Sequence, residues 1–273
     1  MTAQKGPIGA VIAMEVELNH LLDQGTVTRE ERHGPWRDIH VTFGEQTVVA
    51  TQSGIGMVNA AAATEHLIAT YRPRAIVNSG CTGAHVANLM PGDVVIGSET
   101  VHHAALQILA SGEERHVGFN FETVSGGLVV SSALPSDPGL LALTVERAPE
   151  ASFPAWPDEL AWPPDEPRRP VRFFVGPVAS ADVWTQAIER IDRLHLRHGT
   201  LCEDMEAAAI AQIAARYELP FLTIKDISNN ERLAQTALIS ETIGFDPDFP
   251  LVEVGRRAAL LLANVLTNLP DLQ

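Results

Sequence analysis

The chain has 273 residues, 45% of them hydrophobic, and its 19 Lys and Arg against 34 Asp and Glu give a formal net charge of -15. A chain of this length and composition buries a core of ordinary size, so we expect residues 1–273 to form a single domain. A strongly negative chain repels phosphate backbones and anionic lipid headgroups, and no run of basic residues offsets the charge. Nucleic acids and membrane surfaces are therefore excluded as expected partners.

The predicted elements alternate between short β-branched runs and longer Ala- and Leu-rich amphipathic segments, the pattern of a sheet flanked by helices. In chain order we expect a strand at 8–13, a helix at 16–22, antiparallel strand segments at 27–41 and 47–52 around a turn at Gly44, and a helix at 57–71. Further on we expect strands at 75–78 and 94–98, a helix at 140–146, a strand at 173–178, helices at 186–193 and 205–217, a strand at 221–227, and a closing helix at 252–266. The expected fold class is α/β with a central mixed sheet.

Residues 148–170 interrupt this alternation, with seven prolines together with Trp156 and Trp162. Such a density of proline forbids a regular helix or a central strand, so we expect a surface insertion within the domain. Its tryptophans are expected to pack on the body, to cover a site or to meet another subunit.

The two cysteines, Cys81 and Cys202, stand far apart and outside any spacing typical of a zinc site. The simplest compartment for such a chain is a reducing cytoplasm. The apolar run at the N-terminus is too short for a signal peptide, and no stretch is long enough to span a bilayer, so we expect a soluble protein.

Acidic side chains open two of the predicted helices. Glu15 and Glu17 follow the first strand, where ligands bind in open α/β sheets, although two acids in a first helical turn also suit the helix dipole. Glu203, Asp204 and Glu206 open an alanine-rich helix, in which a buried carboxylate needs a partner. A sugar diol is a natural partner, because one carboxylate accepts two hydroxyl hydrogen bonds.

Small and polar residues mark three further segments: Ser53–Gly56, Asn78–Gly83 and Lys225–Asn230. Glycines let backbone approach a ligand, yet each segment is also explained by a tight turn or by Asx-turn chemistry. Four of the five clusters follow a predicted strand, so one edge of the sheet is expected to gather them.

The motifs AMEVE, SGIG, NSGCTG, PGDVVIGSE, ASADVW, EDMEAAAIA and IKDISN resemble, in this order, those of the methylthioadenosine/S-adenosylhomocysteine nucleosidases, within the nucleoside phosphorylase superfamily. The resemblance covers most of the chain from Ile8 to the final helix, with the proline-rich stretch as an extra. It implies a three-layer nucleoside phosphorylase-like fold, a purine nucleoside as the small-molecule partner, and a homodimer.

The resemblance also implies roles for individual residues. Glu17 activates water, Glu206 holds the ribose 2′ and 3′ hydroxyls with Met205 against the sugar, and Trp184 stacks on the base. The other expected substrate contacts lie in the same motifs: Cys81, Gly83, Asp204 and Ser228. Phosphorolytic relatives carry an arginine-bearing loop after the first strand, where this chain has two carboxylates, so hydrolysis is expected, with no metal or other cofactor.

Asn229 departs from the resembling family, which supplies an acid there for purine N7. An amide cannot deliver a proton, although it donates one hydrogen bond and accepts another. Three interpretations stay open: a 6-oxopurine nucleosidase of the futalosine hydrolase or inosine type, a nucleosidase that uses Asp226 or another acid, and a catalytically weakened relative. A phosphate-dependent phosphorylase and a non-catalytic nucleoside-binding protein remain alternatives. Nearby, His102 and His103 are expected to bind the 5′ substituent or to lie on a strand surface.

Overall fold

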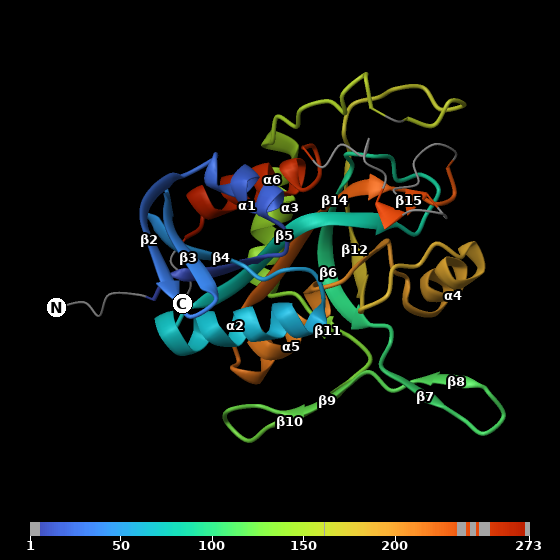
Figure 1. The fold of residues 1–273 in the computed structure, drawn as a ribbon, viewed down its shortest axis with the longest axis horizontal. Helices are drawn as coiled ribbons and strands as arrows, with labels where there is room; N and C mark the ends of the chain where they lie inside the picture. Colours follow the sequence, from blue (N-terminus) through green and yellow to red (C-terminus); the bar gives the residue numbers. More distant parts are fainter. Residues whose placement is uncertain (1–5, 161, 234–238, 241–243, 246–251, 271–273) are drawn as a thin grey trace.

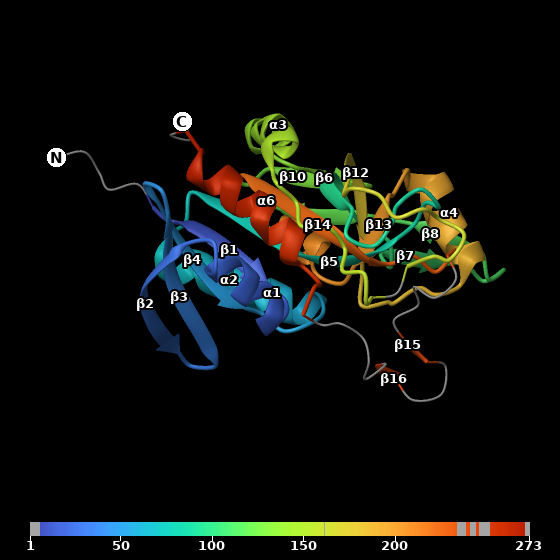
Figure 2. The same ribbon diagram turned by 90° about the horizontal axis from the view of Figure 1, so that it is seen from above.

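The computed structural model describes residues 6–160, 162–233, 239–240, 244–245 and 252–270. A ten-stranded sheet forms the centre, with helices on both faces (Figures 1 and 2). Its strands are β1 (Ile8–Ile12), β2 (Thr26–His33), β3 (Trp36–Phe43), β4 (Gln46–Gln52), β5 (Ala75–Ala84), β6 (Val94–His102), β11 (Leu134–Pro135), β12 (Phe173–Ser180), β13 (Cys202–Asp204) and β14 (Phe221–Asn229). The predicted α/β fold with a mixed central sheet is confirmed.

The sheet runs in the order β11-β6-β12-β13-β5-β1-β4-β3-β2. Strand β1 lies between β4 and β5 and is parallel to both, whereas β2, β3 and β4 form an antiparallel meander. Strand β14 pairs in parallel with β5 and antiparallel with β6. The loops after β1 and β4 therefore emerge at the same edge of the sheet, which is the geometry that the motif pattern predicts.

Part of the sheet closes on itself. Strand β5 pairs with both β14 and β13, β14 pairs with β6, β6 pairs with β12, and β12 pairs with β13. These five strands form a closed ring, because each one has a partner on both sides. The ring brings the ends of β5, β13 and β14 together, and these strands carry three of the motifs.

The helices form the two outer layers. Helices α1 (Glu15–Leu22), α3 (Pro138–Arg147) and α6 (Arg256–Thr267) pack on one face, where Ile8 and Ile12 of β1 point. Helices α2 (Met57–Tyr71) and α5 (Ala207–Arg216) pack on the other face with Val11. Helix α4 (Ile188–His198) lies to one side, beyond β12 and β13 (Figures 1 and 2). Every residue of β1 is buried, as expected for a strand covered on both faces.

Three small two-stranded sheets lie outside the central one. They are formed by β7 (Leu106–Ile108) with β8 (Glu114–His116), by β9 (Phe119–Glu122) with β10 (Leu128–Ser131), and by β15 (Ile239–Ser240) with β16 (Gly244–Phe245). The first two project from the lower side of the body in Figure 1, with β9 and β10 below α5 and β7 and β8 at the lower right. The β9–β10 hairpin is anchored because Phe119 and Phe121 are buried against α5. None of these strands was predicted from the sequence.

The proline-rich insertion begins with a short 3₁₀ helix, η1 (Ala148–Glu150), and its described residues 151–160 and 162–170 form neither helix nor strand. Backbone carbonyl groups of the insertion accept hydrogen bonds from arginine side chains and not from a neighbouring strand. Arg257 of α6 donates to the carbonyls of Pro154 (2.9 Å) and Ala155 (2.6 Å), and its guanidinium lies over the ring of Trp156. Trp156 is thereby packed on the body, one of the expected outcomes for this insertion.

The predicted strand boundaries are wrong at three places, one of which is the strand predicted at 94–98, since β6 continues to His102. Residues 27–41 form two strands and not one, because Gly34 adopts a positive φ of 61° and turns the chain between β2 and β3. The strand predicted at 75–78 continues to Ala84, because residues 79–83 pair with β14. Among the described residues, no helix is long and apolar enough to cross a membrane.

Candidate active site

One pocket opens where the loops after β1 and β4 meet the ends of β5, β13 and β14. It encloses about 830 Å³, including its open mouth, which is within the range of pockets that hold small organic ligands. The residues to which the resemblance gives roles or substrate contacts all line it: Glu17, Cys81, Gly83, Trp184, Asp204, Met205, Glu206, Ser228 and Asn229. Residues from five separate motifs thus converge on a single cavity.

Glu17 is fixed at the base of this pocket. It stands in the first turn of α1, where one carboxylate oxygen accepts a hydrogen bond from the Met14 amide (3.1 Å) and the other accepts from the Cys81 amide (2.7 Å). A side chain at Gly80 or Gly255 would collide with Glu17, so glycine at both positions allows the close approach. Glu17 is 2% exposed, and burial raises its pKa although Lys225 and the two amides act against the rise. A raised pKa suits a group that must accept a proton.

Glu206 faces the same pocket from the N-cap position of α5. One of its oxygens accepts a hydrogen bond from the Gly56 amide (2.8 Å), which ties the SGIG loop to the start of α5. Burial and the repulsion of neighbouring Asp204 raise the pKa of Glu206, while Lys225 and the Gly56 amide lower it. The other oxygen accepts no hydrogen bond from the described residues and is available to a ligand.

Asp204, which lines the pocket, forms a buried ion pair with Lys225, which does not. The Lys225 Nζ lies 2.7 Å from Asp204 Oδ2, and both side chains are almost fully buried. Asp204 also accepts hydrogen bonds from the Ala207 amide at the start of α5. Through these contacts Asp204 positions Lys225 and the start of α5, and its place in the pocket lining leaves its contact with a substrate as a prediction. Lys225 supplies positive charge that partly balances Glu17 and Glu206.

Trp184 is held at the mouth of the pocket by the segment before it. The Met57 amide at the start of α2 donates to Asp182 Oδ1 (2.6 Å), so the ASADVW motif is anchored to the SGIG loop. Trp184 is 36% exposed, which leaves part of the indole accessible. An accessible aromatic face beside a pocket can stack on a planar ligand.

Asn229 lies at the end of β14, in contact with Gly83 of β5. Its amide oxygen accepts a hydrogen bond from Ser228 Oγ (2.8 Å), and its amide nitrogen donates to Glu231 Oε1 (2.8 Å). These two contacts fix which end of the amide faces which neighbour. Asn229 therefore holds the carboxyl group of Glu231, which also lines the pocket.

The sequence did not single out Glu231, and it indicated Glu203 only as one of three acids before α5, without a role in binding; both residues line the pocket. Burial raises the pKa of Glu231, with the hydrogen bond from Asn229 acting against the rise. Glu203 behaves oppositely: burial favours a higher pKa, but the close His103 imidazole and the hydrogen bond with His85 outweigh it and hold the pKa of Glu203 at about 2. Thr185 Oγ1 also donates to Glu203 (2.9 Å). His103 is thus buried against a carboxylate, and the expected strand-surface position is wrong for it.

Asp226 lies outside the pocket, at the start of α6. Its two oxygens accept hydrogen bonds from the backbone amides of Gly255 and Arg257 (both 2.8 Å), so the carboxylate caps the start of α6. It is fully buried and is absent from the pocket lining. The expectation that Asp226 could replace the missing acid is therefore wrong.

A mixed sheet between helical layers, with an acid-lined pocket at the strand ends, defines an α/β protein with a small-molecule site. The chain belongs to the phosphorylase superfamily, whose family model matches residues 7–266.

Individual relatives agree with this assignment. Over 264 residues the chain is 30% identical to a 5'-methylthioadenosine/S-adenosylhomocysteine nucleosidase of Shewanella oneidensis, covering 96% of this chain and 97% of that protein. It is similar to the solved S-adenosylhomocysteine nucleosidase of Streptococcus pyogenes in complex with 5-methylthiotubericidin, with a TM-score of 0.73, 25% identity, and 99% and 100% of the two chains covered. It shares its fold with a futalosine hydrolase of Helicobacter pylori, with a TM-score of 0.74, 20% identity, and 97% and 98% covered.

Proposed function

We propose that this protein is a hydrolase that cleaves the N-glycosidic bond of a purine nucleoside, with methylthioadenosine and S-adenosylhomocysteine as its substrate class. The observation that carries the proposal is the convergence of Glu17 and Glu206 on one pocket that also holds an accessible indole. The similarity to nucleosidases along almost the whole chain supports it.

In the proposed reaction the ribose lies between the two carboxylates. Glu206 accepts hydrogen bonds from the 2′ and 3′ hydroxyls, and its negative charge stabilises the positive charge that develops on the sugar as the bond to the base lengthens. Glu17 removes a proton from a water molecule that attacks C1′. Because Glu17 is held by two backbone amides, its oxygens are oriented before the substrate arrives.

The pocket favours water over phosphate as the nucleophile. Five carboxylates line it: Glu17, Glu203, Asp204, Glu206 and Glu231. Among its described lining residues there is no arginine or lysine, and the nearby Lys225 is already paired with Asp204. A phosphate dianion would enter against this charge, whereas a neutral water would not.

The departing purine needs a proton or a hydrogen bond at N7. Asn229 supplies only a hydrogen bond, so we assign the proton to Glu231, which contacts the Asn229 amide and has a raised pKa. An acid with a raised pKa remains protonated at a pH at which an ordinary carboxyl would not. Asn229 then supplies the hydrogen bond and Glu231 the proton, two roles that a single aspartic acid could fill.

Asn229 also favours a second candidate, a nucleosidase for 6-oxopurines such as inosine or futalosine. An amide that both donates and accepts suits a base whose ring carries a carbonyl and an N–H.

The two substrate classes are separated by incubating the protein with methylthioadenosine, S-adenosylhomocysteine, inosine and futalosine, with and without phosphate, and measuring the free base. We expect adenine release that does not depend on phosphate. Release of hypoxanthine alone would show that the substrates are 6-oxopurine nucleosides. A requirement for phosphate would show that the reaction is phosphorolysis and not hydrolysis. Binding of a free base with no turnover of any nucleoside would indicate a binding protein.

Glu231→Gln tests the proton donor. We expect kcat to fall by about 100-fold, a typical contribution of general acid catalysis. In the unaltered protein the rate should fall as the pH rises through the raised pKa of Glu231, because the protonated form is lost. This alkaline decline should be absent from the variant. The measurement is a pH profile of kcat, with Glu122→Gln, an exposed acid on β9, as the control. An unchanged rate and profile in Glu231→Gln would assign the proton to another group.

We further propose that the chain acts as one domain that carries residues 148–170 as an insertion, and that it works in the cytoplasm as a homodimer. Two free cysteines suit a reducing compartment. The exposed apolar side chains Ile55 and Val58, beside the pocket at the start of α2, suit contact with a second copy.

A further inference from the structure

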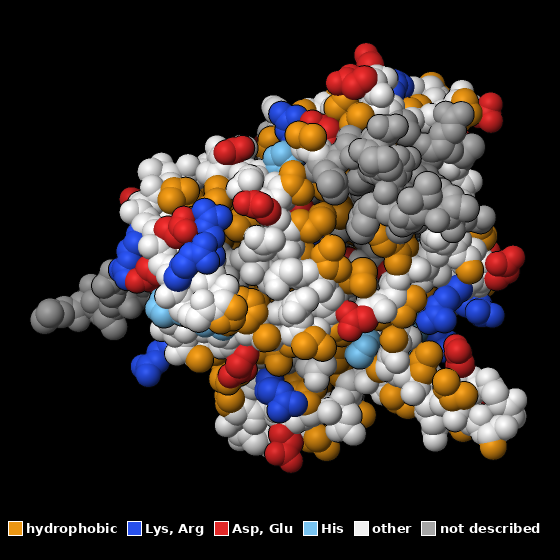
Figure 3. Space-filling model, in the orientation of Figure 1, with side chains coloured by type: hydrophobic (Ala, Val, Ile, Leu, Met, Phe, Trp, Pro, Cys, Tyr) orange, Lys and Arg blue, Asp and Glu red, His pale blue; other side chains and the backbone are white. Residues whose placement is uncertain are grey.

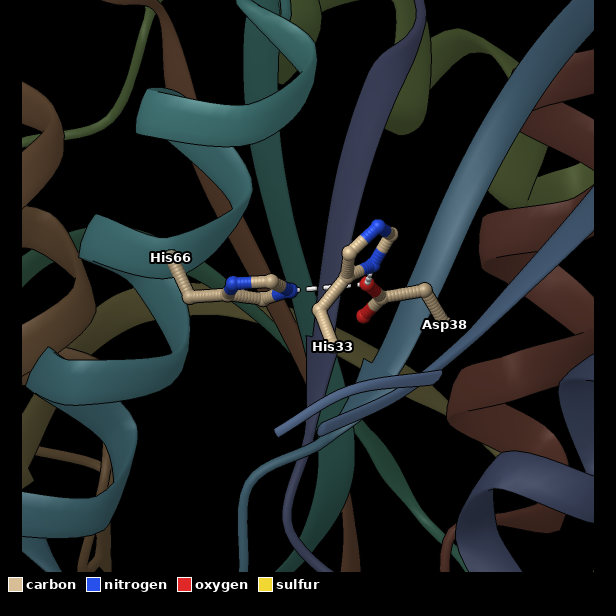
Figure 4. A group of neighbouring side chains, drawn as sticks. All are labelled: His33, Asp38 and His66. Carbon is tan, nitrogen blue, oxygen red and sulfur yellow. Dashed lines mark hydrogen bonds and ion pairs between the residues drawn. The ribbon is translucent and has the colours of Figure 1, made fainter. Parts of the chain in front are cut away.

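A cluster of two histidines and an aspartate lies outside the proposed active site. His33 comes from the end of β2, Asp38 from β3 and His66 from α2, and the three side chains point toward one another (Figure 4). Asp38 Oδ2 is 3.1 Å from His33 Nδ1 and 2.7 Å from His66 Nε2. None of the three lines the pocket, so the proposed hydrolysis does not use them.

The contacts of Asp38 are unevenly shared between its two oxygens. Its Oδ2 is approached by both imidazoles and also accepts from the Tyr71 hydroxyl (2.9 Å), so three polar groups converge on one atom that has two lone pairs. Its Oδ1 is buried and has no hydrogen-bond partner among the described residues. A carboxylate that is 0% exposed and leaves one oxygen unsatisfied is costly unless another ligand binds it.

The orientation of His66 suits metal binding. Its Nδ1 lies 3.3 Å from Thr70 Oγ1, one turn further along α2, and its ring stacks on Trp36 at an interplanar angle of 18°. These contacts hold the ring so that Nε2 faces Asp38. Outer contacts of this kind fix the tautomer and the direction of metal-binding histidines.

His33 gives the cluster a side that is open to solvent. Its side chain is 44% exposed, whereas that of His66 is 11% exposed. An ion can therefore enter past His33, and a water molecule can complete its coordination. The Tyr71 hydroxyl lies beside the cluster, where it donates to Asp38 Oδ2.

We propose that His33, Asp38 and His66 form a binding site for a divalent transition metal ion, Zn²⁺, with Nδ1, a carboxylate oxygen and Nε2 as its ligands. Two imidazoles and one carboxylate are typical zinc ligands, whereas Mg²⁺ and Ca²⁺ favour sites made of oxygen alone. Tetrahedral bonds of about 2.0 Å place ligand atoms about 3.3 Å apart, so the ion enters once Asp38 Oδ2 moves a few tenths of an ångström further from His33 Nδ1 and His66 Nε2. The exposed His33 side chain has the freedom to make this adjustment.

The site is tested by titrating Zn²⁺ into the full chain, stripped of metal with a chelator, in a calorimeter. We expect one equivalent to bind, and a loss of affinity of at least about 10-fold in Asp38→Asn and in His33→Gln, because each removes one ligand. His40→Gln is the matched control, since His40 lies on the same hairpin but pairs with Glu31. The affinity of His40→Gln for Zn²⁺ should equal that of the unaltered protein.

Substitution with Co²⁺ gives a readout that does not depend on affinity, because a tetrahedral site produces visible absorption that His33→Gln should abolish or shift. His33 is exposed, so this variant is expected to fold normally, which circular dichroism checks. Failure of the unaltered protein to bind Zn²⁺, or equal binding by Asp38→Asn, would overturn the proposal. Neither outcome bears on the proposed hydrolysis.

Discussion

Replacement of Glu17 by glutamine should lower kcat by about 1000-fold, within the range typical of general base catalysis. The amide keeps the size of the carboxylate but cannot take a proton from water. The substrate pocket keeps its shape, so a nucleoside analogue that does not react should bind with nearly the affinity that it has for the unaltered protein. Single-turnover kinetics and analogue titration measure the two quantities separately.

The cost of Glu17→Gln to stability should be small. Glu17 accepts hydrogen bonds from two backbone amides, and glutamine retains one acceptor oxygen, so one contact is lost at a cost of about 1–3 kcal/mol. The variant also removes a buried charge, which offsets part of this loss. Glu15→Gln, an exposed neighbour in the same helical turn, is the control and should retain full activity. An active Glu17→Gln protein would show that another group activates water.

Replacement of Glu206 by glutamine should lower kcat/KM by at least about 100-fold, because hydrogen bonds to a charged group contribute about 1.5–3 kcal/mol each and the proposed ribose contact has two. Both binding and turnover should suffer, since the charge of Glu206 acts on the ground state and more strongly on the developing cation. The amide oxygen of glutamine can still accept from the Gly56 amide, so the start of α5 is expected to stay in place.

A 2′-deoxynucleoside makes the Glu206 test specific. The unaltered protein should prefer the ribonucleoside, because the deoxynucleoside leaves one oxygen of Glu206 without its hydroxyl. In Glu206→Gln the preference for the ribonucleoside should shrink, since this variant already lacks the charged partner of the 2′ hydroxyl. An undiminished preference for the ribonucleoside in the variant would place the sugar hydroxyls on other residues.

Much of the fold could be predicted from the sequence because the hydrophobic pattern of its central elements agrees with their local propensity. The helix at 57–71 was predicted with the bounds of α2, since its alanine-rich repeat follows a strand and a glycine pair. The first strand and helix were likewise placed within a residue or two. In these segments both the period of the hydrophobic residues and the glycines that separate one element from the next are clear.

The end of β5 was missed for a physical reason. Ser79, Gly80 and Gly83 have the composition of a turn, yet they lie in a strand because other side chains need the space beside them. Gly80 makes room for Glu17, and Gly83 lies against Asn229. A glycine that permits close approach of a distant residue cannot be told from a turn glycine without that residue.

The motifs identified one group of pocket residues, but they did not reveal Glu231 or the partners of Glu203. Glu231 follows two asparagines in what reads as a polar turn, and only its contact with Asn229 shows that it faces the cavity. Glu203 and His85 are separated by more than one hundred residues, and β5 and β13 bring them together. Pairs of this kind depend on strand register, which the spacing of residues along the chain does not reveal.

The most direct test of the central claim is a crystal structure of this protein with 5-methylthiotubericidin, the ligand present in the Streptococcus pyogenes relative. We predict that its sugar hydroxyls contact Glu206, that a water molecule lies between its anomeric carbon and Glu17, and that its base packs on Trp184 with one edge toward Asn229. A ligand bound away from Glu17 and Glu206, or one whose sugar contacts neither carboxylate, would contradict the proposed cleavage.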